Sequence, residues 1–147
     1  MNPEKTTIEE QLQENGLWLF QTVGDSMEPI LHNRESTVQI TAGNGELRKY
    51  DVVLYKRPAG TYVLHRIRRI RGDTLYICGD NRVGLEKVPR EWVLGKMTGY
   101  YPDTGTKYID CADPEYQEYV KTLPLRYVKL WIRLLPGRIL RKIRKRR

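Results

Sequence analysis

The sequence contains few cysteines and histidines, with two of each among its 147 residues. Cys78 and Cys111 lie far apart, and neither belongs to a Cys-x-x-Cys pair. Their spacing therefore excludes a dithiol redox centre and a zinc site built on paired cysteines. Two cysteines are compatible with a reduced compartment or with a single bridge, and we interpret them as ordinary thiols.

Long hydrophobic runs are also absent. Residues 1–16 are polar and acidic, whereas an export signal has a basic start and an apolar centre. The most apolar stretch, residues 123–140, is too often interrupted to form a membrane-spanning helix. The interruptions are Pro124, Arg126, Lys129, Arg133, Pro136 and Arg138. We therefore expect a protein that is made and kept in the cytoplasm.

Acidic residues are missing from the C-terminal end, since none follows Glu118. The segment 124–147 contains ten of the 26 lysines and arginines, which leaves 16 basic residues against 18 acidic ones in the rest of the chain. The body is thus close to neutral, and the C-terminal segment is the basic element. With 39% hydrophobic residues, a chain of this length can bury the core of one domain.

Capping and turn residues predict an N-terminal helix followed by a β-rich middle. Thr7 and Glu10 have the spacing of a capping box and Asn15-Gly16 is a common helix stop, so a short first helix is predicted. Short spacing between the strands that follow favours a mostly β domain with an antiparallel, partly closed sheet, because parallel strands need crossover helices. Strands are predicted at 18–23, 38–41, 51–56, 61–70, 74–78 and 92–100, with a hairpin turn at 71–74.

Beyond Asp113 the pattern becomes helical. Pro114 suits the first position of a helix, whereas Pro124 and Pro136-Gly137 are expected to interrupt it, so two or three short helices are predicted. The predicted organisation is an N-terminal helix at 1–16, a catalytic β domain at 17–101, a linker with a short helix at 102–123 and a basic amphipathic helical tail at 124–147.

The turn Gly24-Asp25-Ser26-Met27-Glu28-Pro29 directly follows the first predicted strand. Serine becomes a good nucleophile only when a neighbouring base accepts its proton, so a catalytic serine needs a fixed position beside a base. Gly24 permits a tight turn, Pro29 stiffens its exit, and the Ser26 backbone N–H is directed toward a developing oxyanion. We expect Met27 to be buried beneath the turn, and Met27 and Pro29 to border the substrate. Taken alone, Gly-Asp-Ser is better explained as an ordinary turn, because all three residue types favour turns.

His65 is the candidate base. Strand alternation places Val63, His65 and Ile67 on one face, where burial between β-branched residues favours the neutral imidazole. A lone histidine is more often structural, and His32, in a polar loop, is interpreted in that way. A later turn, Cys78-Gly79-Asp80-Asn81-Arg82, can fold back to order a neighbouring site.

Together and in this order, these segments resemble the signal peptidase I and LexA-like serine peptidase family over about residues 18–101. The segment 24–29 is similar to the family's nucleophile box, and Tyr50-Asp51-Val52-Val53 to a strand that usually begins Gly-Asp. Val63-Leu64-His65-Arg66 and Gly79-Asp80-Asn81 are similar to the later boxes. Bacterial signal peptidases and LexA-like proteins have lysine at the position of His65, whereas the endoplasmic-reticulum and archaeal type has histidine, as here.

The resemblance implies a serine endopeptidase that cleaves a leader or signal-like peptide through an acyl-enzyme on Ser26. His65 is then the general base, and the reaction needs no metal and no cofactor. In the histidine type an acidic residue at or soon after the Gly-Asp-Asn box, here Gly79-Asp80-Asn81, helps to orient the histidine, so Asp80 is the first candidate for this role and Glu86 the second.

Three features depart from the family pattern. Gly24 stands where many signal peptidases have a hydroxyl residue, so a side-chain oxyanion donor is missing. Tyr50 replaces the usual glycine of the second box. The N-terminal membrane anchor of classical signal peptidases is also missing, which implies a cytosolic or membrane-apposed leader peptide as substrate, or a different attachment through the C-terminal segment.

Two other functions are compatible with the same fold. A catalytically silent descendant can bind a peptide along a sheet edge as an adaptor, although intact Ser26 and His65 argue against it. A LexA-like regulator cleaves itself and binds DNA, but residues 1–16 are too few for a helix-turn-helix domain. An Ala-Gly pair that could serve as a self-cleavage site does occur at Ala59-Gly60. It lies after Ser26 in a predicted loop, and we interpret it as incidental.

The C-terminal segment combines an apolar stripe at helical spacing with many cationic groups. The stripe consists of Leu125, Val128, Trp131, Ile132, Leu135, Ile139 and Ile143, and the surrounding cations are Arg126, Lys129, Arg133, Lys142 and Arg144. This pattern predicts a helix that lies on an anionic membrane surface, on the inner face of the membrane. The alternatives are packing of the stripe on the β core and phosphate contacts to nucleic acid, the less favoured partner.

Overall fold

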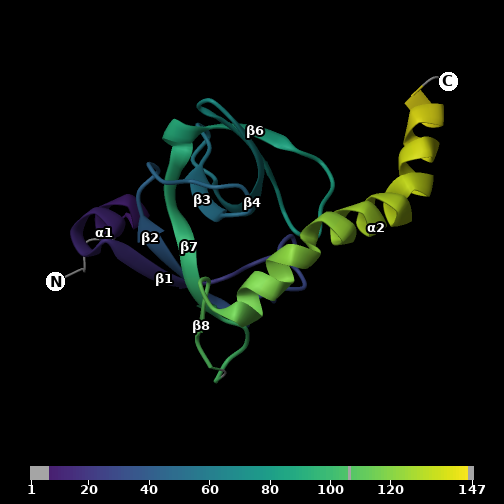
Figure 1. The fold of residues 1–147 in the computed structure, drawn as a ribbon. Helices are drawn as coiled ribbons and strands as arrows, with labels where there is room; N and C mark the ends of the chain where they lie inside the picture. The colour runs from purple at the N-terminus through teal and green to yellow at the C-terminus, as the bar shows by residue number, and fades with distance from the viewer. Residues whose placement is uncertain (1–6, 106, 146–147) are drawn as a thin grey trace.

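A computed structural model describes residues 7–105 and 107–145 of the chain. It contains an eight-stranded sheet between a short N-terminal helix and a long C-terminal helix (Figure 1). The helices are α1 (Ile8–Asn15) and α2 (Pro114–Lys145), and a 3-10 turn, η1, covers Arg90–Trp92. The strands are β1 (Leu17–Gln21), β2 (Thr37–Ala42), β3 (Val52–Lys56), β4 (Tyr62–Arg71), β5 (Thr74–Cys78), β6 (Glu86–Pro89), β7 (Val93–Tyr101) and β8 (Ile109–Asp110).

The expected antiparallel sheet is confirmed. Its strand order is β1-β2-β7-β3-β4-β5-β6, with β8 added to β7, and each pair of neighbouring strands is antiparallel. In the part of the chain that the structure describes, the end strands β1 and β6 do not pair with each other, so the sheet is open. The sequence did not predict β6 and β8, because β6 has only four residues and ends in Pro89, and β8 has only two residues.

Helix α1 begins and ends where its capping residues predict. The Glu10 amide donates to the Thr7 hydroxyl at 3.2 Å, and the Thr7 amide donates to the Glu10 carboxylate at 2.9 Å. Gly16 ends the helix with φ of 73°, in the left-handed region that glycine adopts without strain. Leu12 is buried and packs α1 against the sheet.

Two hydrophobic clusters lie on the two faces of β3. Val52 and Leu54 belong to one cluster, which also contains the buried Met27, while Val53 and Tyr55 belong to the other. This alternation follows from the two-residue period of a strand. Strand β3 is therefore covered on both sides and gives its neighbour β4 a rigid support.

The expectation of two or three short C-terminal helices is wrong, because α2 runs without interruption from Pro114 to Lys145. It also crosses the predicted boundary between 102–123 and 124–147. A proline removes one backbone donor from a helix but does not stop it when neighbouring turns are held by packing. Tyr116 and Tyr127, on either side of Pro124, are both buried, as is Leu123.

The second half of α2 extends beyond the sheet (Figure 1). Within residues 7–105 and 107–145, no helix is both long enough and apolar enough to cross a membrane.

Candidate active site

The segment after β1 is a compact turn that fixes Ser26. Gly24 has φ of 95°, which explains glycine at this position, and its amide donates to the Asn33 side chain at 2.7 Å. Met27 is only 5% exposed, so it is buried beneath the turn as expected. The amides of Ile30 and Leu31 both donate to the Met27 carbonyl, at 3.1 and 3.0 Å. Ser26 therefore lies on a hydrogen-bonded turn whose underside is part of the core.

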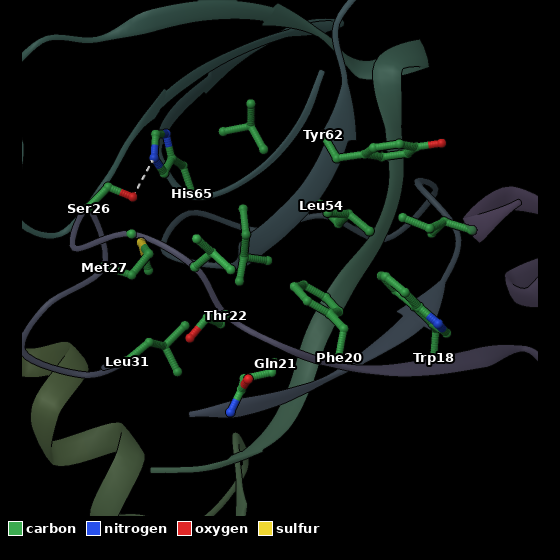
Figure 2. A pocket seen from close by; sticks show the side chains of 15 residues that line it. Trp18, Phe20, Gln21, Thr22, Ser26, Met27, Leu31, Leu54, Tyr62 and His65 are labelled. Carbon is green, nitrogen blue, oxygen red and sulfur yellow. Dashed lines mark hydrogen bonds between the residues drawn. The ribbon is translucent and has the colours of Figure 1, made fainter. Parts of the chain in front are cut away.

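His65 lies in β4 and points toward this turn. Its Nε2 atom is 3.0 Å from the Ser26 hydroxyl oxygen (Figure 2). Strand β4 holds the ring in place by pairing with β3, where His65 is opposite Val53. This distance lies within the range for direct proton transfer from a serine to a base. The structure thus brings together two residues that are 39 positions apart in the sequence.

Burial lowers the pKa of His65 from its ordinary value, because the imidazolium form loses solvation. The negative charge of Glu86 opposes this shift, whereas Arg57 and Arg82 lower the pKa of His65 further. A lowered pKa keeps the ring neutral near pH 7. The neutral ring has the lone pair that a general base needs.

The other histidine does not belong to this pair. His32 lies in the loop that follows the turn 24–29, and its Nδ1 atom is 2.8 Å from the carboxylate of Glu28 in that turn. This placement is consistent with the structural role expected for His32.

The turn 79–82 holds the turn 24–29, which carries Ser26, from the other side. The Asn81 amide donates to the Ser26 carbonyl at 2.9 Å, and the Arg82 guanidinium donates to the Asp25 carboxylate at 2.6 Å. Gly79 packs so closely that a Cβ atom there would lie 2.4 Å from the Ser26 carbonyl oxygen. Only glycine permits this approach. The turn that carries Gly79-Asp80-Asn81 therefore positions Ser26.

Neither acidic candidate makes a hydrogen bond with His65 within the described residues. The Asp80 carboxylate accepts two hydrogen bonds from Arg66, at 2.7 and 2.8 Å. The Glu86 carboxylate accepts from Arg57 and from the Tyr55 hydroxyl. The hydrogen bonds from Arg57 hold the pKa of Glu86 below its usual range, so Glu86 acts on His65 only as a nearby charge.

Strand geometry explains why Asp80 is directed away from the histidine. Adjacent residues of a strand point to opposite faces, so His65 faces Ser26 while Arg66 faces the other side of β4. Arg66 is opposite Cys78 in the pairing of β4 with β5, two residues before Asp80. The Asp80 and Arg66 side chains are both 0% exposed and form an ion pair there.

Three tyrosines of α2 complete this buried ion pair, and sequence reasoning missed them. Arg66 donates to the Tyr116 hydroxyl at 2.8 Å, while the hydroxyls of Tyr119 and Tyr127 donate to Asp80 at 2.8 and 3.3 Å. Their spacing along one helix face is the only signal that the sequence offers. Helix α2 is thereby attached to the same turn that holds Ser26.

Arg66 also supports the second motif. It donates to the carbonyl of Tyr50 at 2.8 Å. Tyr50 has φ of 74°, a left-handed conformation that favours glycine. The position where the sequence departs from Gly-Asp is therefore one at which glycine would be free of strain.

An apolar pocket of about 330 Å³ opens beside the Ser26–His65 pair (Figure 2). Trp18 and Phe20 form one wall with their rings stacked 4.5 Å apart, and Leu54 and Tyr62 lie opposite them. Met27, one of the two residues expected to border the substrate, also lines this pocket. Pro29, the other residue expected to border the substrate, does not line this pocket. It is exposed and borders a different pocket beside α2.

Two unpaired strand edges flank this apolar pocket. Strand β1 is the first strand of the sheet, and among the described residues it pairs only with β2. Strand β4 pairs with β5 only from Arg66 onward, so within the described chain residues 62–65 have a sheet partner on the β3 side alone. Both edges contribute lining residues to the pocket. An extended peptide is the ligand that such edges accept.

The Ser26 amide is a candidate oxyanion donor. Among the described residues, no group accepts a hydrogen bond from it. Gly24, two residues earlier, has no side chain that could add a second donor. The described residues also contain no group of three or more His, Cys, Asp or Glu side chains that could hold a metal ion.

Comparison with known proteins gives no family assignment. No family model matches the chain, and no curated protein matches it.

Proposed function

We propose that this protein is a serine endopeptidase similar to signal peptidase I and the LexA-like peptidases, with a Ser–His catalytic pair. The observation that carries the proposal is the 3.0 Å contact between the Ser26 hydroxyl and Nε2 of His65, at the mouth of an apolar pocket. A histidine whose pKa is lowered by burial has the protonation state that this role requires. The left-handed backbone at Tyr50 is a second point of agreement with a family that usually has glycine there.

The geometry supports the following sequence of steps. His65 Nε2 accepts the Ser26 proton as Oγ attacks the carbonyl carbon of the peptide, and the Ser26 amide donates to the resulting oxyanion. The imidazolium then gives its proton to the departing amine, which leaves an acyl-enzyme on Ser26. Water attacks the ester with His65 again as base, and the acid product leaves as the Ser26 hydroxyl is restored.

The substrate in this proposal is a leader or signal-like peptide bound in an extended conformation. Backbone hydrogen bonds to the free edges of β1 and of residues 62–65 would hold the peptide, and the pocket of about 330 Å³ would take its apolar side chains. Aromatic walls formed by Trp18, Phe20 and Tyr62 favour an apolar side chain over a charged one.

A fluorophosphonate probe, followed by mass mapping of the labelled residue, tests the proposal. The chain has only two serines, and the second, Ser36, is 0% exposed, so the assignment is simple. We expect a label on Ser26 that is lost in His65→Ala and kept in His32→Ala, the matched histidine control. Absence of labelling in the wild-type protein, or equal labelling of Ser26→Ala, would contradict a catalytic Ser26. If Ser26 is not labelled but the protein still binds a peptide, the adaptor function is favoured.

A further inference from the structure

Helix α2 has two apolar faces, and only one of them is covered. Tyr116, Leu123 and Tyr127 are buried against the sheet. Leu125, Val128 and Ile132 follow one another at spacings of three and four residues on a different side of the helix. Their exposed fractions are 59%, 55% and 57%, so packing on the β core does not account for them.

This uncovered face is an apolar stripe of useful size. It contains Leu125, Val128, Trp131 and Ile132, with Trp131 46% exposed. Leu135 continues the stripe and is half-buried, while the side chains of Ile139 and Ile143 lie outside the described residues. A contiguous group of large exposed apolar side chains commonly marks a surface for a partner or a membrane.

Cationic side chains border the stripe without acidic neighbours on the helix. Arg126, Lys129 and Arg133 are exposed and line a pocket of about 360 Å³ beside α2, whose other side is formed by two loops that contribute Glu28, Pro29, Asp80 and Asn81. In the part of the chain that the structure describes, Lys129 and Arg133 form no ion pair. No acidic residue follows Glu118 in the sequence. The helix therefore fits a partner surface with an apolar interior for the stripe and negative charges at the boundary for the cations.

We propose that α2 binds the surface of an anionic membrane, with the stripe inserted between lipid headgroups and the cations paired with lipid phosphates. This inference goes beyond peptidase activity and does not depend on it. A membrane is favoured over nucleic acid because phosphate contacts would use the cations but would leave the exposed stripe, including Trp131, unexplained. The buried face of α2 stays on the sheet, so the catalytic domain would be held at the membrane through the same helix.

Sedimentation of the full chain with vesicles tests this inference. We expect binding to phosphatidylcholine vesicles that contain phosphatidylserine, much weaker binding to phosphatidylcholine alone, and loss of binding at high salt. Val128→Ser with Ile132→Ser should weaken binding more than roughly tenfold, because apolar burial is lost. Lys129→Gln with Arg133→Gln should weaken binding to the anionic vesicles by roughly 30-fold, given the usual contribution of each cation. Truncation is avoided, since Leu123 and Tyr127 are part of the core.

Matched substitutions away from α2 control for general effects. Leu17→Ser with Leu85→Ser removes two side chains that are 45% and 53% exposed, and Arg69→Gln with Arg71→Gln removes two exposed charges from the β4–β5 hairpin. Both controls should bind vesicles like the wild-type protein. If the wild-type protein stays in the supernatant with anionic vesicles at low salt, the inference is wrong. It is also overturned if the Val128/Ile132 variant binds normally, and equal binding of duplex DNA by that variant would then identify nucleic acid as the partner.

Discussion

Removal of the Asp80 charge should destabilise the protein severely. The Asp80 and Arg66 side chains are both 0% exposed, and Asp80 also accepts hydrogen bonds from Tyr119 and Tyr127. Asp80→Asn would leave a buried guanidinium without its counter-charge. Breaking one side of a buried ion pair costs about 3–5 kcal/mol, a large part of the roughly 5–15 kcal/mol that stabilises a typical domain.

Urea unfolding followed by circular dichroism measures this loss, with thermal unfolding as a second readout. A domain of this size loses about 2–4 °C in Tm per kcal/mol, so we expect a decrease of roughly 6–20 °C. Glu118→Gln is the control, because it breaks an ion pair with Lys121 whose side chains are 71% and 72% exposed. Such an exposed pair contributes at most about 1 kcal/mol.

Two outcomes would refute the reasoning about Asp80. One is a loss below about 1 kcal/mol for Asp80→Asn, which would mean that the pair is not desolvated as the structure has it. The other concerns the double variant Arg66→Met with Asp80→Asn, which should be more stable than Asp80→Asn alone because the unpaired charge is gone. Equal or lower stability of the double variant would show that the uncompensated charge is not the cause.

Three further predictions concern the candidate active site. Ser26→Ala and His65→Ala should each abolish peptide cleavage with an unchanged circular dichroism spectrum, and near-normal turnover by either variant would contradict their joint role. Because the pKa of His65 is lowered, the acid limb of kcat/KM against pH should have its midpoint below 6.5, the ordinary value. Glu86→Gln removes the charge that most raises this pKa, so the midpoint should fall further, and a rise would disprove the assignment. Gly79→Ala should reduce both stability and labelling of Ser26, whereas Gly84→Ala, where a Cβ meets nothing within 4 Å, should do neither.

The sequence predicts the elements whose signals are local. Thr7 and Glu10 define the start of α1, and the glycine at position 72, with φ of 58°, lies in the predicted hairpin turn. The signal for the turn 24–29 is also local, because Gly24 and the turn-forming residues around it determine its shape. Proximity of Ser26 and His65 was expected only through a family resemblance, since periodicity cannot tell which strands become neighbours.

The points at which the structure differs from local sequence signals have a common physical origin in tertiary packing. Asp80 and Glu86 were candidates to orient His65. In the structure, buried Arg66 donates two hydrogen bonds to the Asp80 carboxylate, and half-buried Arg57 donates two to that of Glu86. A sequence does not show which cation a carboxylate will meet. Similarly, Pro124 predicts a helix break from local chemistry alone, whereas contacts of the flanking turns with the sheet keep α2 continuous.

The free edge of β1 has a consequence for selectivity. Backbone hydrogen bonds are the same for every amino-acid sequence, so an unpaired strand edge can pair with any extended chain, including a second copy of this protein. The five-residue length of β1 limits such pairing, because few hydrogen bonds can form along it. If β1 binds a peptide substrate as proposed, selection among peptide sequences would come from side chains in the adjoining pocket. One selection would come from the backbone of β1 itself. Proline has no backbone N–H, so it is the one residue that would weaken binding at each position where the bound chain must donate a hydrogen bond to β1.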